Sequence, residues 1–297
     1  MKAYLLAGKP YHMPSRLFHL IVLVVTLILA GCQSSALASS SLREPIKLGG
    51  STTVAPAAAA LAMAYMEEHP ELEISVRGGG SGLGVKGIAY GGFHIGMASR
   101  PLSSSELEKW PNLQTTTIGR DGVAVAINKS LFDAGVKGLT LVQIAQIWRG
   151  DVVNWRELGG PDLPILLYDR ERGSGTRDAF LGTIFGDQEP TMTDVAGVFV
   201  GNEDILSAIT ENSGAVSILS LGWLRADVVG VNIVNNMGEA IEPTVENVNN
   251  GRYPISRDLN FITDSSLSDN GSQFIQYVLS PEGQALVAEA GYVPVSP

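Results

Sequence analysis

Three clusters of glycine and hydroxyl residues each stand between a predicted β-strand and a predicted α-helix. Strands that alternate with helices along a chain predict an α/β fold with largely parallel sheets. The clusters are Gly50-Ser51-Thr52-Thr53, Gly80-Ser81-Gly82 and Gly173-Ser174-Gly175-Thr176. The pattern predicts strands at 46–48, 72–77, 94–99 and 164–168, and helices at 53–68, 85–90 and 174–185. Capping boxes predict two more helix starts, at Ser103 with Glu106 and at Thr140 with Gln143.

These clusters are suited to binding an oxyanion. The first turn of a helix presents unpaired backbone N–H groups and a positive dipole end, and a neighbouring hydroxyl adds a donor. Each cluster alone is better explained by ordinary capping, because serine and threonine are common N-caps. Three clusters in one chain, the third beside Arg170 and Arg172, favour a shared tetrahedral anion. The alternative role of these arginines is a surface salt bridge with Asp169 or Glu171.

The N-terminus has the pattern of a lipoprotein signal peptide. Lys2, Lys9 and Arg16 precede a short apolar run, which ends in small residues before Cys32. The run is shorter than the roughly 20 apolar residues of a membrane-spanning helix, which is the alternative reading. The segment 29–32 resembles a bacterial lipobox, which implies that Cys32 is acylated. We therefore predict a signal peptide at 1–31 and a flexible, serine-rich tether at 32–44.

The charge of the chain limits its partners. The net charge is −10, from 20 basic and 30 acidic residues. Removal of residues 1–31 takes away three basic residues and no acidic ones, so the mature chain carries −13. Nucleic acid and anionic membrane surfaces are therefore poor partners.

The sequence does not match the motifs of several common enzyme classes. The glycine spacing at 79–84 is not followed by the lysine and hydroxyl residue of a P-loop. The segment 82–87 matches a dinucleotide fingerprint, but the next predicted strand ends at Ser99 and Arg100 instead of an acid. Neither Ser81 nor Ser174 stands in a nucleophile elbow. The mature chain has only His69 and His94, and no metal-ligand spacing appears among its acids. We predict no enzyme activity, cofactor or metal, although a hydrolase that uses Ser81 or Ser174 stays an alternative.

The ordered set of motifs resembles the phosphate-binding proteins of high-affinity phosphate ABC transporters, over residues 45–297. The likeness includes the three glycine clusters and extends to segments without them. These segments are Ile95-Gly96-Met97-Ala98-Ser99-Arg100, Arg120-Asp121-Gly122-Val123-Ala124-Val125, Trp148-Arg149-Gly150, Asn154-Trp155, Tyr253-Pro254-Ile255, Ser280-Pro281-Glu282-Gly283-Gln284 and Gly291-Tyr292-Val293-Pro294.

The resemblance implies a two-lobed fold of the periplasmic-binding-protein type (type II), with the ligand in a cleft between the lobes. Lobe I is expected at 45–122 plus 258–297, and lobe II at 123–257. The protein is expected to be a monomer that delivers phosphate to an ABC permease with separate ATPase subunits. By the same resemblance the phosphate ligands are Thr52, Thr53, Ser81, Ser99, Arg170, Ser174, Gly175 and Thr176.

One position departs from the family pattern. Some members have an aspartate where this chain has Ser99, and that aspartate accepts the proton of a protonated phosphate. A serine can accept or donate a hydrogen bond. Sulfate or another oxyanion therefore stays open as the ligand, as does a phosphate sensor with the same fold. Asp121 is a possible substitute acceptor.

Overall fold

The computed structural model describes residues 45–186 and 195–295. The predicted signal peptide, the predicted tether and Cys32 lie outside these residues. Across the two described ranges, no helix combines the length and the apolar character needed to cross a membrane.

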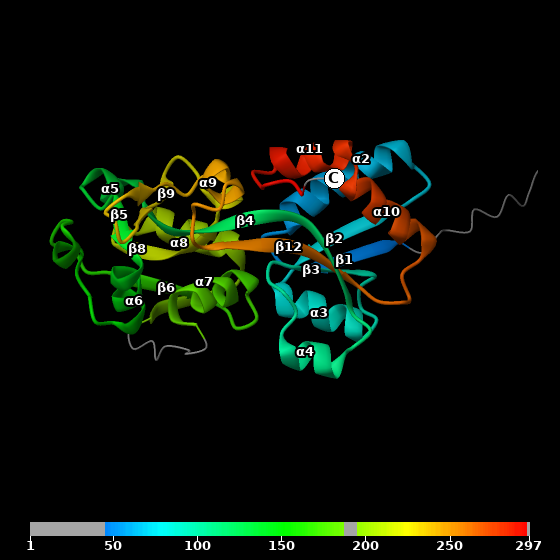
Figure 1. Cartoon of the computed structure of the whole chain (residues 1–297), viewed down its shortest axis with the longest axis horizontal. Helices are drawn as coiled ribbons and strands as arrows, with labels where there is room; N and C mark the ends of the chain where they lie inside the picture. Colours follow the sequence, from blue (N-terminus) through cyan, green and yellow to red (C-terminus); the bar gives the residue numbers. More distant parts are fainter. Residues whose placement is uncertain (1–44, 187–194, 296–297) are drawn as a thin grey trace, which may run out of the picture. The chain divides into compact units, whose positions relative to one another are not determined.

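The described residues form strands and helices in alternation (Figure 1). The strands are β1 (Ile46–Gly50), β2 (Ile74–Gly78), β3 (Ile95–Ala98), β4 (Gln114–Asn128), β5 (Gly138–Thr140), β6 (Leu166–Arg170), β7 (Val195–Phe199), β8 (Ala215–Ser220), β9 (Val228–Gly230), β10 (Asn232–Val234), β11 (Ala240–Ile241) and β12 (Ser256–Thr263). The α-helices are α2 (Ala55–Glu68), α3 (Ser81–Ala89), α4 (Ser104–Lys109), α5 (Lys129–Asp133), α6 (Leu141–Arg149), α7 (Gly175–Phe185), α8 (Gly201–Glu211), α9 (Val245–Asn249), α10 (Asp269–Leu279) and α11 (Pro281–Glu289). Two 3-10 helices are η1 (Trp155–Leu158) and η2 (Leu221–Trp223).

Two groups of parallel strands lie at the ends of one sheet, whose order is β2-β1-β3-β12-β4-β8-β6-β7, with β9 paired to β4. In the first group β1 pairs in parallel with β2 and β3, and in the second β6 pairs in parallel with β7 and β8. Helices α2, α3, α7 and α8 follow β1, β2, β6 and β7, so their N-termini stand at the carboxyl ends of parallel strands. This is where ligands bind in open α/β sheets.

Between the two groups the sheet is antiparallel. The long strand β4 pairs antiparallel with β12 and β8, and β12 also pairs antiparallel with β3. Figure 1 shows β4 and β12 running side by side from one group to the other. The α/β class is confirmed, but the expectation of largely parallel sheets is wrong. Strand β12 runs antiparallel to its neighbours β3 and β4. A prediction that considers each strand only with the helix that follows it cannot detect this direction.

Most expected elements are present, with two shifts that matter for the site. Helix α3 begins at Ser81, four residues before the expected start, because Gly80 adopts a φ of +89° that allows a direct turn from strand to helix. Strand β6 ends at Arg170 instead of residue 168, so the arginine occupies the last position of the strand. Both predicted capping boxes are confirmed, at the starts of α4 and α6.

Two large hydrophobic cores lie on either side of the crossing strands. One gathers side chains from β1, β3, α2, α10 and α11, with Ile118 from β4 and Leu259 from β12. The other gathers side chains from β4 starting at Val123, from α6, α7 and β8, and from Ile255 just before β12. We call the part of the molecule around the first core lobe I and the part around the second lobe II.

Lobe II also carries a small sheet of order β11-β10-β5. Trp148 and Trp155 lie fully buried in its main core. Replacement of such a side chain by alanine lowers the free energy of unfolding by about 3–5 kcal/mol.

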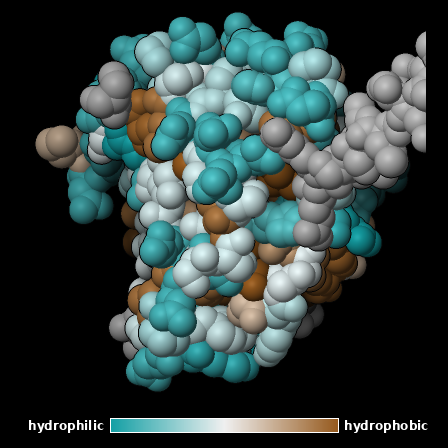
Figure 2. Space-filling view, turned by 90° about the vertical axis from the view of Figure 1, so that its right-hand side faces the viewer, coloured by the Kyte–Doolittle hydropathy of each residue, from teal (hydrophilic) through white to brown (hydrophobic). Residues whose placement is uncertain are grey.

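On the side of lobe I seen in Figure 2, polar residues cover most of the surface and hydrophobic residues form separate patches.

Candidate functional site

The N-termini of four helices meet between the two lobes. Helices α2 and α3 come from lobe I, and helices α7 and α8 come from lobe II. The hydroxyl oxygens of Thr53 and Thr176 are 3.3 Å apart. A side chain at Gly175 would place its Cβ only 2.3 Å from the Ser81 hydroxyl and 2.6 Å from that of Ser99. The structure thus brings the three sequence clusters together, with a fourth helix start beside them.

All but one of the predicted site residues are buried. Thr52 is half-buried and lies at the edge of the cluster. The others, each at most 2 % exposed or buried within the first turn of α7, are Thr53, Ser81, Ser99, Arg170, Ser174, Gly175 and Thr176. Buried polar groups require hydrogen-bond partners, so their contacts decide what the site can bind.

Three serines of lobe I form a chain of hydroxyl groups. The Ser51 hydroxyl donates to that of Ser99 at 3.0 Å, and the hydroxyls of Ser99 and Ser81 are 3.3 Å apart. Ser51 Oγ also accepts the backbone N–H groups of Thr53 and Val54, which fixes its own hydrogen on Ser99. Ser81 Oγ accepts the backbone N–H of Ser99 at 3.0 Å. Each hydroxyl has one hydrogen and two lone pairs. The bonds from Ser51, from the Ser99 N–H and between Ser81 and Ser99 use three of the four lone pairs and one of the two hydrogens. One hydroxyl hydrogen and one lone pair of Ser81 and Ser99 therefore remain for a ligand.

Thr53 joins the two lobes. Its Oγ1 accepts from Asn202 Nδ2 at 3.1 Å and from Arg257 Nη2 at 3.1 Å. These two bonds occupy both lone pairs of the hydroxyl. Its hydrogen is therefore directed at Thr176 or at a ligand.

Arg170 is buried at the end of β6 and held on two sides. Nε and Nη2 donate to the Glu171 carboxylate at 2.9 and 3.1 Å, and Nη1 donates to Asn202 Oδ1 at 3.2 Å. These contacts use three of the five N–H groups of the guanidinium. The salt bridge with Glu171 exists, but it is only partly exposed: 1 % of the Arg170 side chain and 16 % of the Glu171 side chain are accessible. Arg172 is exposed and does not join the cluster.

Sequence reasoning missed two residues of this cluster. Asn202 follows Gly201 at the turn from β7 into α8, the same glycine-to-helix signal that marks the other three turns. Its Nδ2 donates to Thr52 as well as to Thr53. Arg257 stands in β12, 204 positions after Thr53, and no local motif marks it.

Arg257 is paired with Asp121 across the crossing strands. The two residues are register partners in β12 and β4, and Nε and Nη2 of Arg257 donate to Asp121 Oδ2 at 3.2 and 2.9 Å. Burial raises the pKa of the Asp121 carboxyl, and the guanidinium beside it opposes that shift. The other oxygen of Asp121 accepts the backbone N–H of Leu221. Asp121 thus contacts Arg257, and Arg257 contacts Thr53.

Further contacts between the two lobes lie beside the cluster. The backbone N–H of Gly82 donates to the Gly173 carbonyl at 3.0 Å. Arg100 Nε forms an ion pair with Asp178 of α7 at 2.9 Å, while its two terminal nitrogens donate to Glu106. These contacts hold the start of α7 against lobe I.

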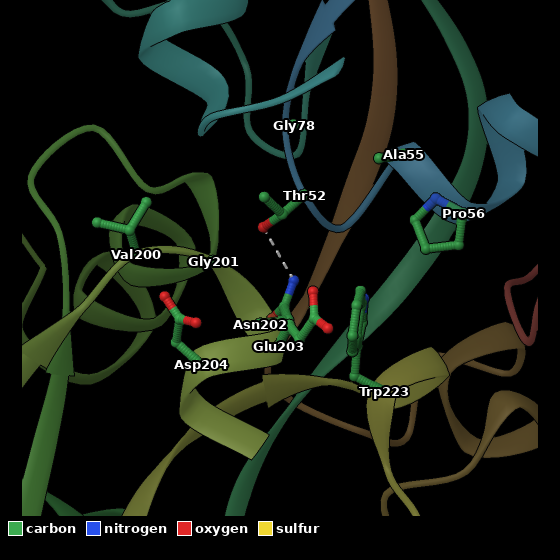
Figure 3. Close-up of a pocket in the computed structure, with 10 residues that line it drawn as sticks. All are labelled: Thr52, Ala55, Pro56, Gly78, Val200, Gly201, Asn202, Glu203, Asp204 and Trp223. Carbon is green, nitrogen blue, oxygen red and sulfur yellow. Dashed lines mark hydrogen bonds between the residues drawn. The ribbon is translucent and has the colours of Figure 1, made fainter. Parts of the chain in front are cut away.

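A pocket of 440 Å³ opens beside the buried cluster (Figure 3). It shares Thr52 and Asn202 with the cluster, and Figure 3 shows the hydrogen bond between them. Glu203, Asp204 and Trp223 also line it. The carboxylates make this pocket unsuited to an anion, so it flanks the buried cluster instead of forming part of it.

Comparisons with known proteins agree with this geometry. Residues 35–282 match the PBP superfamily domain. A putative phosphate ABC transporter substrate-binding protein from Clostridium perfringens, solved with bound phosphate, is 35 % identical, with a TM-score of 0.78; the match covers 85 % of this chain and 100 % of that one. An ABC-type phosphate transport receptor from Vibrio cholerae is 30 % identical, with a TM-score of 0.68, over 84 % of this chain and 100 % of that one.

A curated relative gives the same result. The phosphate-binding protein PstS of Bacillus subtilis is 29 % identical over 253 residues, which are 84 % of this chain and 81 % of that protein. The two-lobed α/β fold and the family expected from the sequence are confirmed. The chain belongs to the PBP superfamily and, within it, to the substrate-binding proteins of phosphate ABC transporters.

Proposed function

We propose that this chain captures inorganic phosphate between its two lobes, outside the cytoplasmic membrane, and delivers it to an ABC permease. One observation carries the proposal: hydroxyl groups, helix N-termini and the Arg170 guanidinium from both lobes converge in one buried cluster. Such donors match the four oxygens of a tetrahedral anion. The phosphate-binding relatives support this ligand.

The proposed ligands divide by lobe. Lobe I supplies Thr52, Thr53, Ser81 and Ser99, and lobe II supplies Arg170, Ser174, Gly175 and Thr176. The first-turn N–H groups of Gly175 and Thr176 have no partner within helix α7. Ser174 Oγ accepts the N–H of Arg177, which leaves its hydroxyl hydrogen for phosphate.

Closure of the lobes is the proposed mechanism of capture. Lobe boundaries at 122/123 and 257/258 are supported by the change of hydrophobic core between Ile118 and Val123 in β4, and between Ile255 and Leu259 around β12. Bending of these two crossing strands opens the cleft, as in hinged binding proteins. The closed, liganded monomer then docks on the permease, which works with separate ATPase subunits.

Acylation of Cys32 is the proposed means of retention at the membrane. The lipobox-like segment 29–32 supports it. The serine-rich residues 32–44 would then separate the lipid from lobe I.

The chain binds phosphate without catalysing a reaction, in keeping with relatives that are described as binding proteins and receptors.

Sulfate is the second candidate ligand, and Ser99 is the observation that favours it. A carboxylate facing sulfate would oppose two negative charges without a proton between them, whereas a serine adds no such repulsion. Asp121 is unsuited to replace the missing acceptor, because Arg257 and the Leu221 N–H already occupy its oxygens.

Calorimetric titration of the purified mature protein with phosphate, sulfate and arsenate tests the proposal. We expect saturable one-to-one binding of phosphate and arsenate, the two anions that carry a proton near neutral pH. Binding of sulfate in preference to phosphate would assign the chain to the second ligand. Binding of none of the three would contradict the proposed function.

A further inference from the structure

Arg257 has an unsatisfied nitrogen at the oxyanion site. Within residues 45–186 and 195–295, its Nη1 atom is buried and has no hydrogen-bond partner. The side chain is only 2 % exposed. A buried charged donor without an acceptor carries a large desolvation cost, so an acceptor at this position would be strongly bound.

The orientation of the guanidinium is fixed by two contacts. Nε and Nη2, which form one edge of the group, hold Asp121 Oδ2. Nη2 also reaches Thr53 Oγ1 at 3.1 Å. Nη1 and Nη2 form the other edge, so the unsatisfied nitrogen stands next to the one that contacts Thr53.

Thr53 connects this arginine to the rest of the cluster. Its hydroxyl is 3.3 Å from that of Thr176 at the start of α7. It also accepts from Asn202, whose amide oxygen accepts from Arg170. Both guanidinium groups are thus bonded to the Asn202–Thr53 pair: Arg170, from lobe II, to Asn202, and Arg257, from the crossing strand β12, to Thr53.

We propose that Arg257 is a second anion-binding arginine, whose Nη1 donates to an oxygen of the ligand held beside Thr53. The inference rests on the proposed oxyanion function and adds a binding residue that comes from neither lobe's helix N-termini. Because Arg257 stands on β12, it contacts the ligand from the base of the cleft, where the strands that bend on closure lie.

The test must separate ligand contact from support of the fold. Arg257→Gln alone would leave the Asp121 carboxylate buried without its cation, which destabilises the fold by itself. The informative protein is the double variant Arg257→Gln/Asp121→Asn, which removes both charges. Its matched control is Arg156→Gln/Asp162→Asn, an exposed pair in lobe II.

Calorimetry with inorganic phosphate gives the result. We expect the double variant to bind phosphate about tenfold or more weakly than wild type, since a hydrogen bond to a charged group is lost. Asp121→Asn, which keeps the arginine but weakens the contact that orients it, should lose less affinity than the double variant. The exposed control pair should match wild type. Wild-type affinity in a folded double variant would overturn the inference, because Arg257 would then serve only to neutralise Asp121.

A second measurement uses wild-type protein and does not depend on a variant folding. Wild type labelled with ¹⁵N-arginine is titrated with phosphate, and the Arg257 side-chain signal is assigned by its loss in Arg257→Lys. We expect that signal to shift on phosphate addition and its N–H exchange to slow. An Arg257 signal that stays unchanged while phosphate binds would contradict the inference alone. Failure of wild type to bind phosphate would contradict the proposed function itself.

Discussion

Glu171 holds the guanidinium of its chain neighbour Arg170 through two hydrogen bonds, from Nε at 2.9 Å and from Nη2 at 3.1 Å. The same carboxylate lies 3.4 Å from the backbone N–H of Gly201 at the start of α8. Asn202 fixes a third nitrogen of the arginine. Arg170 is therefore set in one orientation before a ligand arrives, which lowers the entropy cost of binding.

Arg170→Ala should weaken phosphate binding by at least about tenfold, because hydrogen bonds to a charged partner are worth about 1.5–3 kcal/mol each. Ser174→Ala, which removes one neutral donor, should weaken it less. Arg225→Ala is the control, since Arg225 is exposed and donates to backbone carbonyls next to it. Calorimetry measures all three. If Arg170→Ala binds as wild type does, the arginine assignment is wrong and Arg257 is the next cation to test.

Ser99→Asp should sharpen the rejection of sulfate and shift phosphate binding towards protonated forms at lower pH. The reason is that a carboxylate here would need a ligand proton to face it. Competitive calorimetry of both proteins with phosphate and sulfate, from mildly acidic to mildly alkaline pH, measures the change. If wild type excludes sulfate completely and the substitution has no effect, another group accepts the proton of the bound phosphate.

Asp178→Asn should speed the release of phosphate. The substitution removes the ion pair between Asp178 and Arg100, which connects the two lobes and is partly exposed. Partly exposed pairs are worth little, so we expect the dissociation rate to rise only about two- to fivefold, and the difference to shrink at high salt. Stopped-flow kinetics measures the rate. Asp162→Asn removes an exposed pair within lobe II and should release phosphate at the wild-type rate; an equal effect of both variants would contradict a role in closure.

Glu106 should make stability depend on pH. Burial raises the pKa of its carboxyl, but hydrogen bonds from Arg100 and Ser103 outweigh burial and hold the pKa below the usual 4.5. A carboxyl with a lowered pKa in the folded state stabilises the fold above its unfolded-state pKa, and this contribution is lost as the pH falls through the folded-state pKa. The difference in melting temperature between wild type and Glu106→Gln should therefore be largest near pH 7 and shrink below about pH 4.5. A difference that stays constant down to pH 3 would refute this assignment.

Cys32→Ala should abolish attachment to the membrane. Wild type expressed in its native host should incorporate labelled palmitate and partition into detergent, because two or more acyl chains anchor stably. The variant should do neither. Soluble, unlabelled wild-type protein would rule out acylation at Cys32.

The sequence alone determined the elements that carry the site. Glycine followed by hydroxyl residues places Thr53, Ser81 and Ser174 at or just before the starts of their helices, because the preference for such residues there is local. The alternation of strand and helix determined the α/β class, and the order of the motifs determined the family.

Only the tertiary structure decided which side chains meet and which way the crossing strand runs. Strand β12 pairs with β3 and β4 through contacts distant in the chain, so its antiparallel direction left no local signal. The same pairing brings Arg257 to Asp121, 136 positions earlier, and to Thr53. Asn202 did carry the local glycine signal, but its bond to Arg170 depends on β6 and β7 pairing in lobe II, and its bond to Thr53 forms only where the two lobes meet. The physical reason is that helix starts follow from neighbours in the chain, whereas pairing of buried charges follows from which distant strands share a sheet.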